Sequence, residues 1–115
     1  MTLKTEKPWG YEELLEHNSS YVLKKLFMKK NHQCSLQYHE MKHETLYVIS
    51  GKLKLTIGEE IQKLEEVTLQ ENDFYVLPPL KIHRMFGITD CIYLESSTPE
   101  LDDVVRLKDD YNRII

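Results

Sequence analysis

Apolar and polar residues alternate along much of the chain in the pattern of short β-strands. The clearest case is residues 52–57, where Leu53, Leu55 and Ile57 alternate with polar residues. A period of two places the apolar side chains on one face of a strand and the polar ones on the other, as in a half-buried sheet. The turn residues at 58–60 lead into residues 61–69, so these two segments are predicted to form a hairpin.

Further segments have the same character and are separated by turn residues such as Gly51 and Pro78-Pro79. The predicted strands comprise residues 21–30, 34–39, 44–50, 74–77, 83–86 and 91–96. Strands at intervals of about ten residues favour an all-β sandwich or barrel. The tail, residues 99–115, mixes apolar and charged positions in a pattern that fits either a short helical turn or a strand.

The length and the net charge of the chain argue against several classes of function. The 115 residues fit a single domain spanning 1–115. The net charge of -4, without a basic block, argues against nucleic-acid binding. The apolar stretches are shorter than the roughly 20 residues of a membrane helix, and the first residues lack the apolar core of a signal peptide, so we expect a cytoplasmic protein with no membrane partner. Cys34 and Cys91 are predicted to be buried apolar residues rather than a disulfide pair.

Four side chains with metal-binding atoms have a spacing that suits a metal site. Gln37 and His39 are two residues apart, so on a strand they point to the same face. Glu44 lies five residues further on, where a turn can return it toward them, and His83 comes from a separate segment. Three local ligands and one distant ligand can hold a divalent transition metal and leave a position open to substrate. We therefore predict a metal site, the alternative for each residue being a solvated side chain near a turn.

Two segments resemble the motifs of the cupin family. The first motif is matched by Gln37, His39, Glu44 and Gly51. The second motif is matched by Asn72, Pro78, His83 and Gly87. The usual first motif begins with a histidine where this chain has Gln37. Cupins are small jelly-roll β-barrels with the metal inside the barrel, so the resemblance implies that fold.

A longer set of segments resembles the C-terminal domain of type II mannose-6-phosphate isomerases. The matching segments are residues 7–10, 35–39, 44, 77–78, 83–84, 102–106 and 109–113. In most members this domain follows a nucleotidyltransferase that makes GDP-mannose, whereas this chain begins close to Pro8-Trp9-Gly10. We therefore expect a stand-alone cupin domain with a short N-terminal arm and a C-terminal tail. The resemblance implies interconversion of mannose 6-phosphate and fructose 6-phosphate, and family behaviour together with exposed edge strands predicts a homodimer.

The chain departs from this family at Lys42, where an arginine linked to isomerase activity is usual. Lysine keeps the charge but loses the planar fork of arginine, so metal binding tolerates the change better than isomerisation does. Two alternatives stay open: a non-catalytic cupin that binds a metal and a sugar, and another cupin enzyme such as a dioxygenase or decarboxylase. Oxygen chemistry usually uses two or three histidines on a redox metal, and Gln37 weighs against it.

An aldose–ketose isomerase moves a proton between carbons 2 and 1 of the open-chain sugar. A divalent cation among the four ligands would act as a Lewis acid on the sugar oxygens; zinc is the first candidate, and manganese, iron or nickel also fit. His43 is the predicted proton carrier because histidine titrates near neutrality, its alternative being a solvent-facing loop residue. Lys42, at the position of the family arginine, is the second catalytic candidate.

A sugar phosphate also requires cationic side chains near the metal. The candidates are Lys42, Arg84, Arg106 and Arg113. Arginine forks match phosphate oxygens. Arg84 follows His83 directly, and neighbours on a strand point to opposite faces, so we rank Lys42 above Arg84 for substrate contact.

Overall fold

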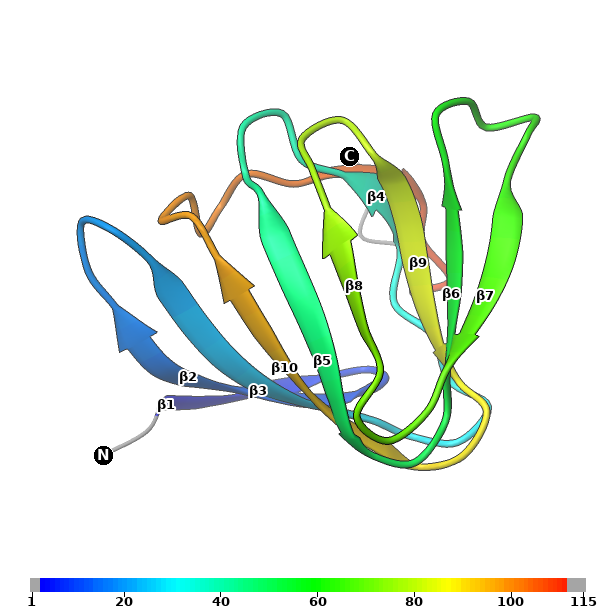
Figure 1. The fold of residues 1–115 in the computed structure, drawn as a ribbon, viewed down its shortest axis with the longest axis horizontal. Helices are drawn as coiled ribbons and strands as arrows, with labels where there is room; N and C mark the ends of the chain where they lie inside the picture. The colour runs from blue at the N-terminus through cyan, green and yellow to red at the C-terminus, as the bar shows by residue number, and fades with distance from the viewer. Residues whose placement is uncertain (1–2, 112–115) are drawn as a thin grey trace.

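The computed structural model describes residues 3–111, which form two antiparallel sheets facing each other (Figure 1). One sheet contains, in spatial order, β1 (Leu3–Lys7), β2 (Gly10–His17), β3 (Val22–Met28), β10 (Cys91–Ser97), β5 (Glu44–Ser50) and β8 (Phe74–Leu77). The other contains β11 (Val105–Lys108), β4 (Leu36–Tyr38), β9 (Ile82–Gly87), β6 (Leu53–Gly58) and β7 (Glu65–Leu69). The predicted all-β barrel is confirmed. Residues 3–111 hold no helical segment that could serve as a membrane span.

The alternating pattern located most strands correctly. Leu53, Leu55 and Ile57 on β6 are buried, with at most 5% of any of them exposed, as the period of two predicts. The predicted hairpin forms with Leu53 opposite Leu69 on β7, although residues 61–64 belong to the turn rather than to a strand. The ambiguous tail contains β11, which pairs with β4.

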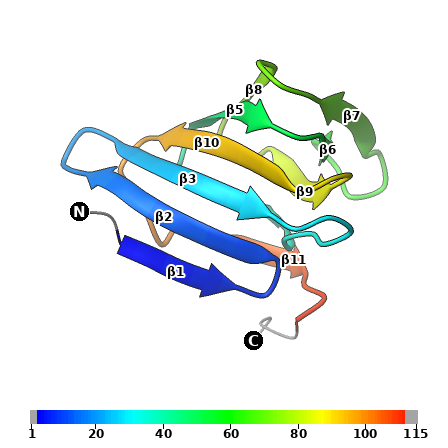
Figure 2. The same ribbon diagram turned by 90° about the horizontal axis from the view of Figure 1, so that it is seen from below.

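The N-terminal segment, expected as a short arm, is a hairpin that is anchored in the barrel sheet. Residues 3–17 form the β1–β2 hairpin, which pairs with β3 and extends the sheet beyond β10 (Figure 2). At the turn of this hairpin Trp9 packs into the core. Gly10 follows with a φ of 153°, and a Cβ there would lie 1.8 Å from the backbone oxygen of Phe27. Only glycine permits this approach of β2 to β3.

The space between the sheets is apolar in one part and polar in another. Apolar side chains such as Met28, Val48 and Leu55 are fully buried and form the core. Glu44 begins β5 and His83 is the second residue of β9, and both are also buried. Polar groups therefore gather where β5 and β9 begin, beyond the apolar core. Both cysteines are buried and free, as predicted.

Candidate metal centre

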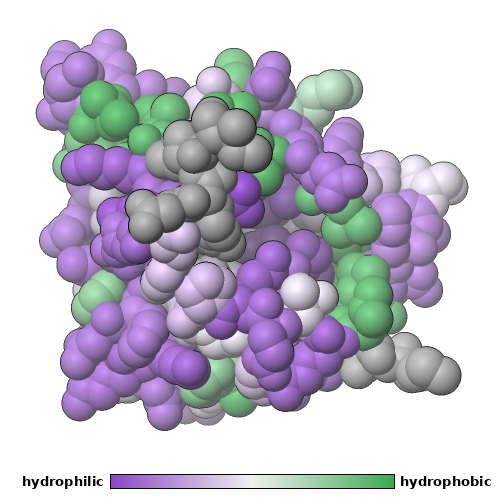
Figure 3. All heavy atoms as spheres, turned by 180° about the vertical axis from the view of Figure 1, so that it is seen from behind, coloured by the Kyte–Doolittle hydropathy of each residue, from purple (hydrophilic) through white to green (hydrophobic). Residues whose placement is uncertain are grey.

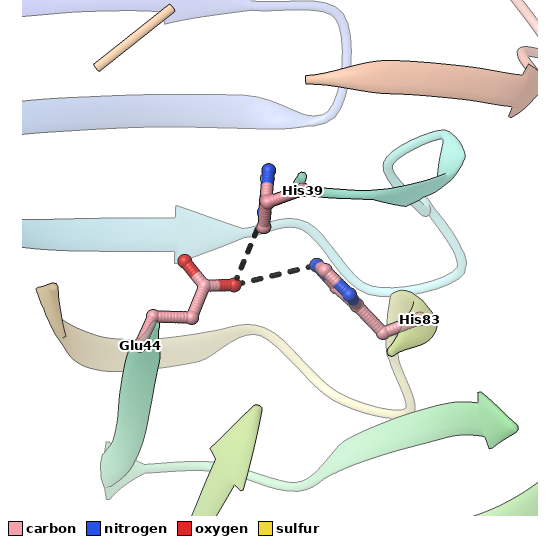
Figure 4. Close-up of side chains that lie close together, drawn as sticks. All are labelled: His39, Glu44 and His83. Carbon is pink, nitrogen blue, oxygen red and sulfur yellow. Dashed lines mark ion pairs between the residues drawn. The ribbon is translucent and has the colours of Figure 1, made fainter. Parts of the chain in front are cut away.

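His39, Glu44 and His83 converge inside the barrel (Figure 4). His39 lies directly after β4, Glu44 begins β5 and His83 lies on β9. The Nε2 atoms of His39 and His83 are 3.4 Å and 3.3 Å from the same oxygen of Glu44, Oε1. The three side chains are no more than 5% exposed. Their ligand atoms all lie within 4.8 Å of one another, which is a separation that one metal ion can bridge.

Backbone carbonyls fix the orientation of both imidazoles. Nδ1 of His39 is hydrogen bonded to the carbonyl oxygen of Asp103, and Nδ1 of His83 to that of Lys81 at 2.9 Å. A carbonyl oxygen only accepts, so each Nδ1 donates a proton to it, and Nε2 is the ring nitrogen that each histidine directs at Glu44. This is the arrangement of metal-binding histidines held by a backbone partner.

The buried ligand atoms form no hydrogen bond within the described part of the chain, although the three side chains lie close to one another. Nε2 of His39, Nε2 of His83 and both carboxylate oxygens of Glu44 make no hydrogen bond there. Buried polar atoms are rarely left unsatisfied. A divalent cation would satisfy the nitrogen lone pairs and the carboxylate together, so the residues present fit a metal ion.

Glu44 is held in its ionised form. Burial raises the pKa of this carboxyl, but the interactions with His39 and His83 and the charge of Lys42 outweigh it, so the pKa lies well below its usual range. Nζ of Lys42 is 3.8 Å from Oε2 of Glu44, and its side chain is 7% exposed. A carboxylate that stays ionised is suited to metal ligation.

Gln37, the fourth predicted ligand, lies beside this cluster. It is opposite His83 in the β4–β9 ladder and opposite Arg106 in the β4–β11 ladder. Its side-chain oxygen accepts a hydrogen bond of 2.6 Å from Oγ of Ser35. A carbonyl oxygen has two lone pairs, so this bond leaves one lone pair for a further partner.

Asp103 shapes the loop that carries His39, a role that sequence reasoning missed. Its carboxylate accepts hydrogen bonds from the backbone N–H groups of Glu40, Met41 and Lys42 at 3.0, 2.7 and 2.8 Å. The same residue supplies the carbonyl that orients His39. The Asp102-Asp103 pair was part of the family resemblance, but its spacing from His39 gave no sign of this contact.

A cavity of about 460 Å³ lies next to the three buried side chains. Its polar and charged lining includes Gln37, His39, Lys42, Glu44, Glu95 and Arg106. Gln37 and His39 therefore face the same space, as their spacing predicted. The face of the molecule seen in Figure 3 is hollowed near its centre and bordered mainly by hydrophilic side chains.

The predicted phosphate-binding residues divide into different locations. Lys42 and Arg106 line the cavity, and Nε of Arg106 is buried without a hydrogen-bond partner among residues 3–111. Arg84 does not line the cavity. Its guanidinium donates to the carbonyl oxygens of Cys34 and Lys108 at 3.0 and 3.2 Å and lies 3.6 Å from the carboxylate of Asp110.

Arg84 thus holds the C-terminal segment, and its inclusion among the substrate-binding residues is corrected. The physical reason is the alternation of side chains on β9: His83 points between the sheets, so Arg84 points away from them. Arg113 lies outside the described residues.

The structure does not bring His43, the predicted proton carrier, to the cavity. His43 is exposed and is absent from the cavity lining. Its backbone N–H donates to the hydroxyl of Thr98, and its carbonyl accepts from the N–H of the same residue. Lys42 and Glu44 on either side are buried, so the intervening side chain turns toward solvent.

Glu95 on β10 lines the cavity instead, and sequence reasoning missed it. It is 7% exposed. The signal was present in the alternation of β10, because Cys91, Tyr93 and Ser97 are also buried and occupy the same face. An acidic residue on the buried face of a strand requires a reason, since unpaired charges are seldom buried.

The sequence is similar to a known protein family and to known biosynthetic proteins. Residues 1–109 match a family described as "Mannose-6-phosphate isomerase C-terminal". The chain is 30% identical to the xanthan biosynthesis protein XanB of Xanthomonas campestris, a match covering 96% of the chain and 24% of XanB. It is 27% identical to the mannose-1-phosphate guanylyltransferase ManC of Salmonella typhimurium, with 94% of the chain and 22% of ManC covered. The chain therefore spans less than a quarter of the length of these relatives.

Solved structures share the fold at lower identity. The capsular polysaccharide assembling protein CapF of Staphylococcus aureus superposes with a TM-score of 0.80 and 16% identity over 94% of this chain and 34% of CapF. The oxalate decarboxylase of Bacillus subtilis, a protein with Mn(II) centres, superposes with a TM-score of 0.78 and 18% identity over 90% of this chain and 29% of that protein. These likenesses confirm the cupin fold.

Proposed function

The chain belongs to the family of the mannose-6-phosphate isomerase C-terminal domain, and on this premise we propose that it is a metal-dependent sugar-phosphate isomerase. The leading reaction is the interconversion of mannose 6-phosphate and fructose 6-phosphate. The observation that carries the proposal is the set of unsatisfied ligand atoms on His39, Glu44 and His83 beside a charged cavity. Unpaired nitrogens and an ionised carboxylate in a buried place suit a metal ion better than they suit stability alone.

The proposed ligands are His39, Glu44 and His83, with Gln37 as the fourth. One carboxylate and neutral donors leave a net positive charge on a divalent cation, which would supply Lewis-acid stabilisation to the oxygens of the sugar. Zinc is the first candidate, and manganese, iron or nickel also suit nitrogen and oxygen donors. The Mn(II) centres of the oxalate decarboxylase, which shares the fold, support a divalent metal in this chain.

The cavity suits a phosphorylated sugar in size and charge. Its volume of about 460 Å³ falls within the range of about 300–1,000 Å³ that small-molecule pockets have. We propose that Arg106 and Lys42 bind the phosphate or the sugar oxygens, because both are cationic and both line the cavity. Lys42 also lies beside Glu44, which places its ammonium near the reacting end of a sugar that contacts the metal.

We further propose a single cupin domain that works as a homodimer in the cytoplasm. The support for a dimer is β8, an edge strand of the larger sheet on which Phe74 and Val76 are 64% and 43% exposed. An exposed apolar edge strand is a ready surface for another chain.

A non-catalytic cupin that binds a metal and a sugar is the second candidate. It is favoured by the ion pair between Lys42 and Glu44, because a lysine held by the metal ligand is less available to substrate than a free arginine fork.

An activity assay separates the two candidates. The purified protein is stripped with a chelator, reloaded in turn with zinc, manganese, iron and nickel, and incubated with mannose 6-phosphate. We expect fructose 6-phosphate with at least one metal. Stoichiometric metal binding without product under any condition would contradict the isomerase and favour the binding protein.

A further inference from the structure

Glu95 is a buried carboxyl without a partner in the wall of the cavity. Its side chain makes no hydrogen bond and no ion pair within 4 Å among residues 3–111, although the residue is only 7% exposed. Neither of its oxygens is sealed off, since the residue lines the cavity. The carboxyl is therefore accessible to a ligand in the cavity and to little else.

The β-sheet register places Glu95 next to the candidate metal centre on the inner face of the larger sheet. Glu95 on β10 is opposite Leu46 on β5, and Ser97 is opposite Glu44. Residues two apart share a face, so Glu95 and Glu44 are diagonal neighbours on the inner face of the sheet. Diagonal neighbours in antiparallel strands are about 7–8 Å apart along the backbone. Glu95, Glu44 and His39 line the same cavity, so a sugar bound there can reach both the carboxyl and the metal ligands.

The charged groups around Glu95 leave it without a dedicated counterion. Lys24 on β3 is opposite Glu95 in the ladder, but its ammonium lies 3.5 Å from Glu12 on β2. Lys42 lies 3.8 Å from Glu44. Burial and then the charge of Glu44 raise the pKa of Glu95 to about 8, against the opposing charges of Lys42 and Lys24; the charge of Glu12 also raises it. A general acid–base group is most effective with a pKa near the working pH.

We propose that Glu95 is the catalytic residue that carries the proton between carbon 2 and carbon 1 of the sugar. This inference rests on the isomerase function proposed above. It assigns to a carboxyl in the cavity the role that the sequence assigned to His43, which the fold places in solvent.

The transfer balances with one carboxyl group. The Glu95 carboxylate takes the proton from carbon 2 of open-chain mannose 6-phosphate. The electron pair of the broken C–H bond forms a double bond between carbons 1 and 2, and the aldehyde oxygen becomes the negative oxygen of an enediolate. The same carboxyl then returns the proton to carbon 1, while the proton of the carbon 2 hydroxyl passes to the oxygen on carbon 1. The product is the ketose, with no external oxidant or reductant.

Other acidic groups in the cavity lining are less suited to this role. Glu12 lies 3.6 Å from Lys7 and 3.5 Å from Lys24, so two ammonium groups already balance its charge. Asp102 lines the cavity but is exposed. Glu44 is directed at the two histidines.

The test compares Glu95→Gln with a control, Glu65→Gln, which changes an exposed carboxyl on β7 outside the cavity lining. Each metal-reloaded protein is assayed with mannose 6-phosphate and with its carbon 2-deuterated form. We expect Glu95→Gln to lower kcat by about 100- to 10,000-fold, the usual contribution of a general acid–base group. Metal content and the affinity for mannose 6-phosphate should stay at the wild-type level, which a merely structural role would not produce. Glu65→Gln should keep kcat within about tenfold of wild type.

The outcomes separate the two proposals. If the wild type turns over and Glu95→Gln keeps kcat within about tenfold, the assignment of Glu95 is overturned while the isomerase function stands. If the wild type is inactive with every metal, both are overturned. Should Glu95→Gln fail to fold, Glu95→Asp decides, because it keeps the charge on a shorter side chain: a lowered kcat with unchanged substrate affinity supports the proposal, and wild-type kcat overturns it.

Discussion

Glu44 and Glu95 are diagonal neighbours on adjacent strands, and the protein shifts the pKa values of their carboxyl groups in opposite directions. The pKa of Glu44 lies well below its usual range because of the two histidines and Lys42, whereas burial and the charge of Glu44 raise the pKa of Glu95 to about 8. A pair of acids whose environments separate their pKa values in this way is suited to two different tasks. In our account Glu44 binds the metal and Glu95 exchanges a proton with the substrate.

The raised pKa of Glu95 predicts a specific pH dependence of stability. The pKa of a glutamate carboxyl is about 4.5 in the unfolded chain, and burial with the charge of Glu44 raises the pKa of Glu95 to about 8 in the folded protein. The folded state therefore binds more protons between these values, so this group's contribution to stability is present below pH 4.5 and is lost as the pH rises through 8. Glu95→Gln removes that loss. At pH 8 the free energy of unfolding of Glu95→Gln should therefore exceed that of the wild type by a few kcal/mol.

Urea denaturation of the metal-free proteins at pH 5 and pH 8 measures this difference. Other titrating groups change stability in the same range, but they are common to both proteins and cancel in the comparison. Equal pH dependence in wild type and Glu95→Gln would show that Glu95 titrates normally in the folded protein.

Removing one imidazole of the centre should abolish tight metal binding. His83→Ala deletes one of three buried ligands, and the alanine side chain supplies no atom that could replace it, so the affinity for zinc should fall by at least about 100-fold. His17→Ala is the matched control, because His17 is an exposed histidine at the end of β2. Isothermal titration of the metal-free proteins gives both affinities. Equal zinc affinity in His83→Ala and His17→Ala would remove the metal site from the account.

Asp103 should support the metal centre without touching the metal. Asp103→Ala deletes the carboxylate that accepts three backbone hydrogen bonds from residues 40–42, beside His39. Loss of such a supporting residue typically lowers metal affinity by about 10- to 100-fold. The control is Asp102→Ala, an exposed neighbour whose backbone carbonyl accepts a hydrogen bond from the N–H of Val104. Metal affinity that is identical in the two variants would show that the loop holds His39 without Asp103.

Arg106 and Arg84 should separate substrate binding from stability. Arg106→Ala removes a cation from the cavity and should raise the KM for mannose 6-phosphate by at least about tenfold. Arg84→Ala removes contacts to Cys34, Lys108 and Asp110 on the outer side of β9, so it should leave KM unchanged and lower stability by about 1–3 kcal/mol. Steady-state kinetics and thermal unfolding of both variants test this. A raised KM in Arg84→Ala would show that the tail it holds contributes to the site.

Lys42 should be required for turnover rather than for folding. Lys42→Ala leaves Glu44 without its nearby ammonium and removes a cation from the cavity, so kcat/KM should fall by at least about tenfold. Lys42→Arg, which restores the residue usual in the resembling isomerases, should keep or raise kcat/KM because its fork binds oxygen pairs. Lys52→Ala, at an exposed position, is the control. Unchanged kcat/KM in Lys42→Ala would exclude Lys42 from the reaction.

Periodicity predicted the strands that have one buried face, and motif spacing predicted the residues that meet. The alternation at Leu53, Leu55 and Ile57 is a direct consequence of burial on one face, and the two-residue spacing of Gln37 and His39 brought both to the cavity. The β1–β2 hairpin was missed because its residues are mostly exposed or half-buried, so no apolar face marks them.

Long-range partners could not be predicted in the same way. The position of Glu95 beside the metal centre depends on the pairing of β10 with β5, which makes Glu95 a diagonal neighbour of Glu44. The position of His43 outside the cavity depends on a loop whose backbone is hydrogen bonded to Thr98. Neither the strand register nor this loop contact can be predicted from the spacing of residues within a short segment. The misplacement of Arg84 had a local warning, since it follows an inward-facing histidine on a strand.

The most direct measurement of the central claim is NMR of mannose 6-phosphate in D₂O with the wild-type protein reloaded with each divalent metal. We expect fructose 6-phosphate with at least one metal, deuterium at carbon 1 where the carried proton exchanges with solvent, and no product after chelation. Mannose 6-phosphate that stays unchanged and undeuterated with every metal, in protein shown to be folded and metal-loaded, would contradict it.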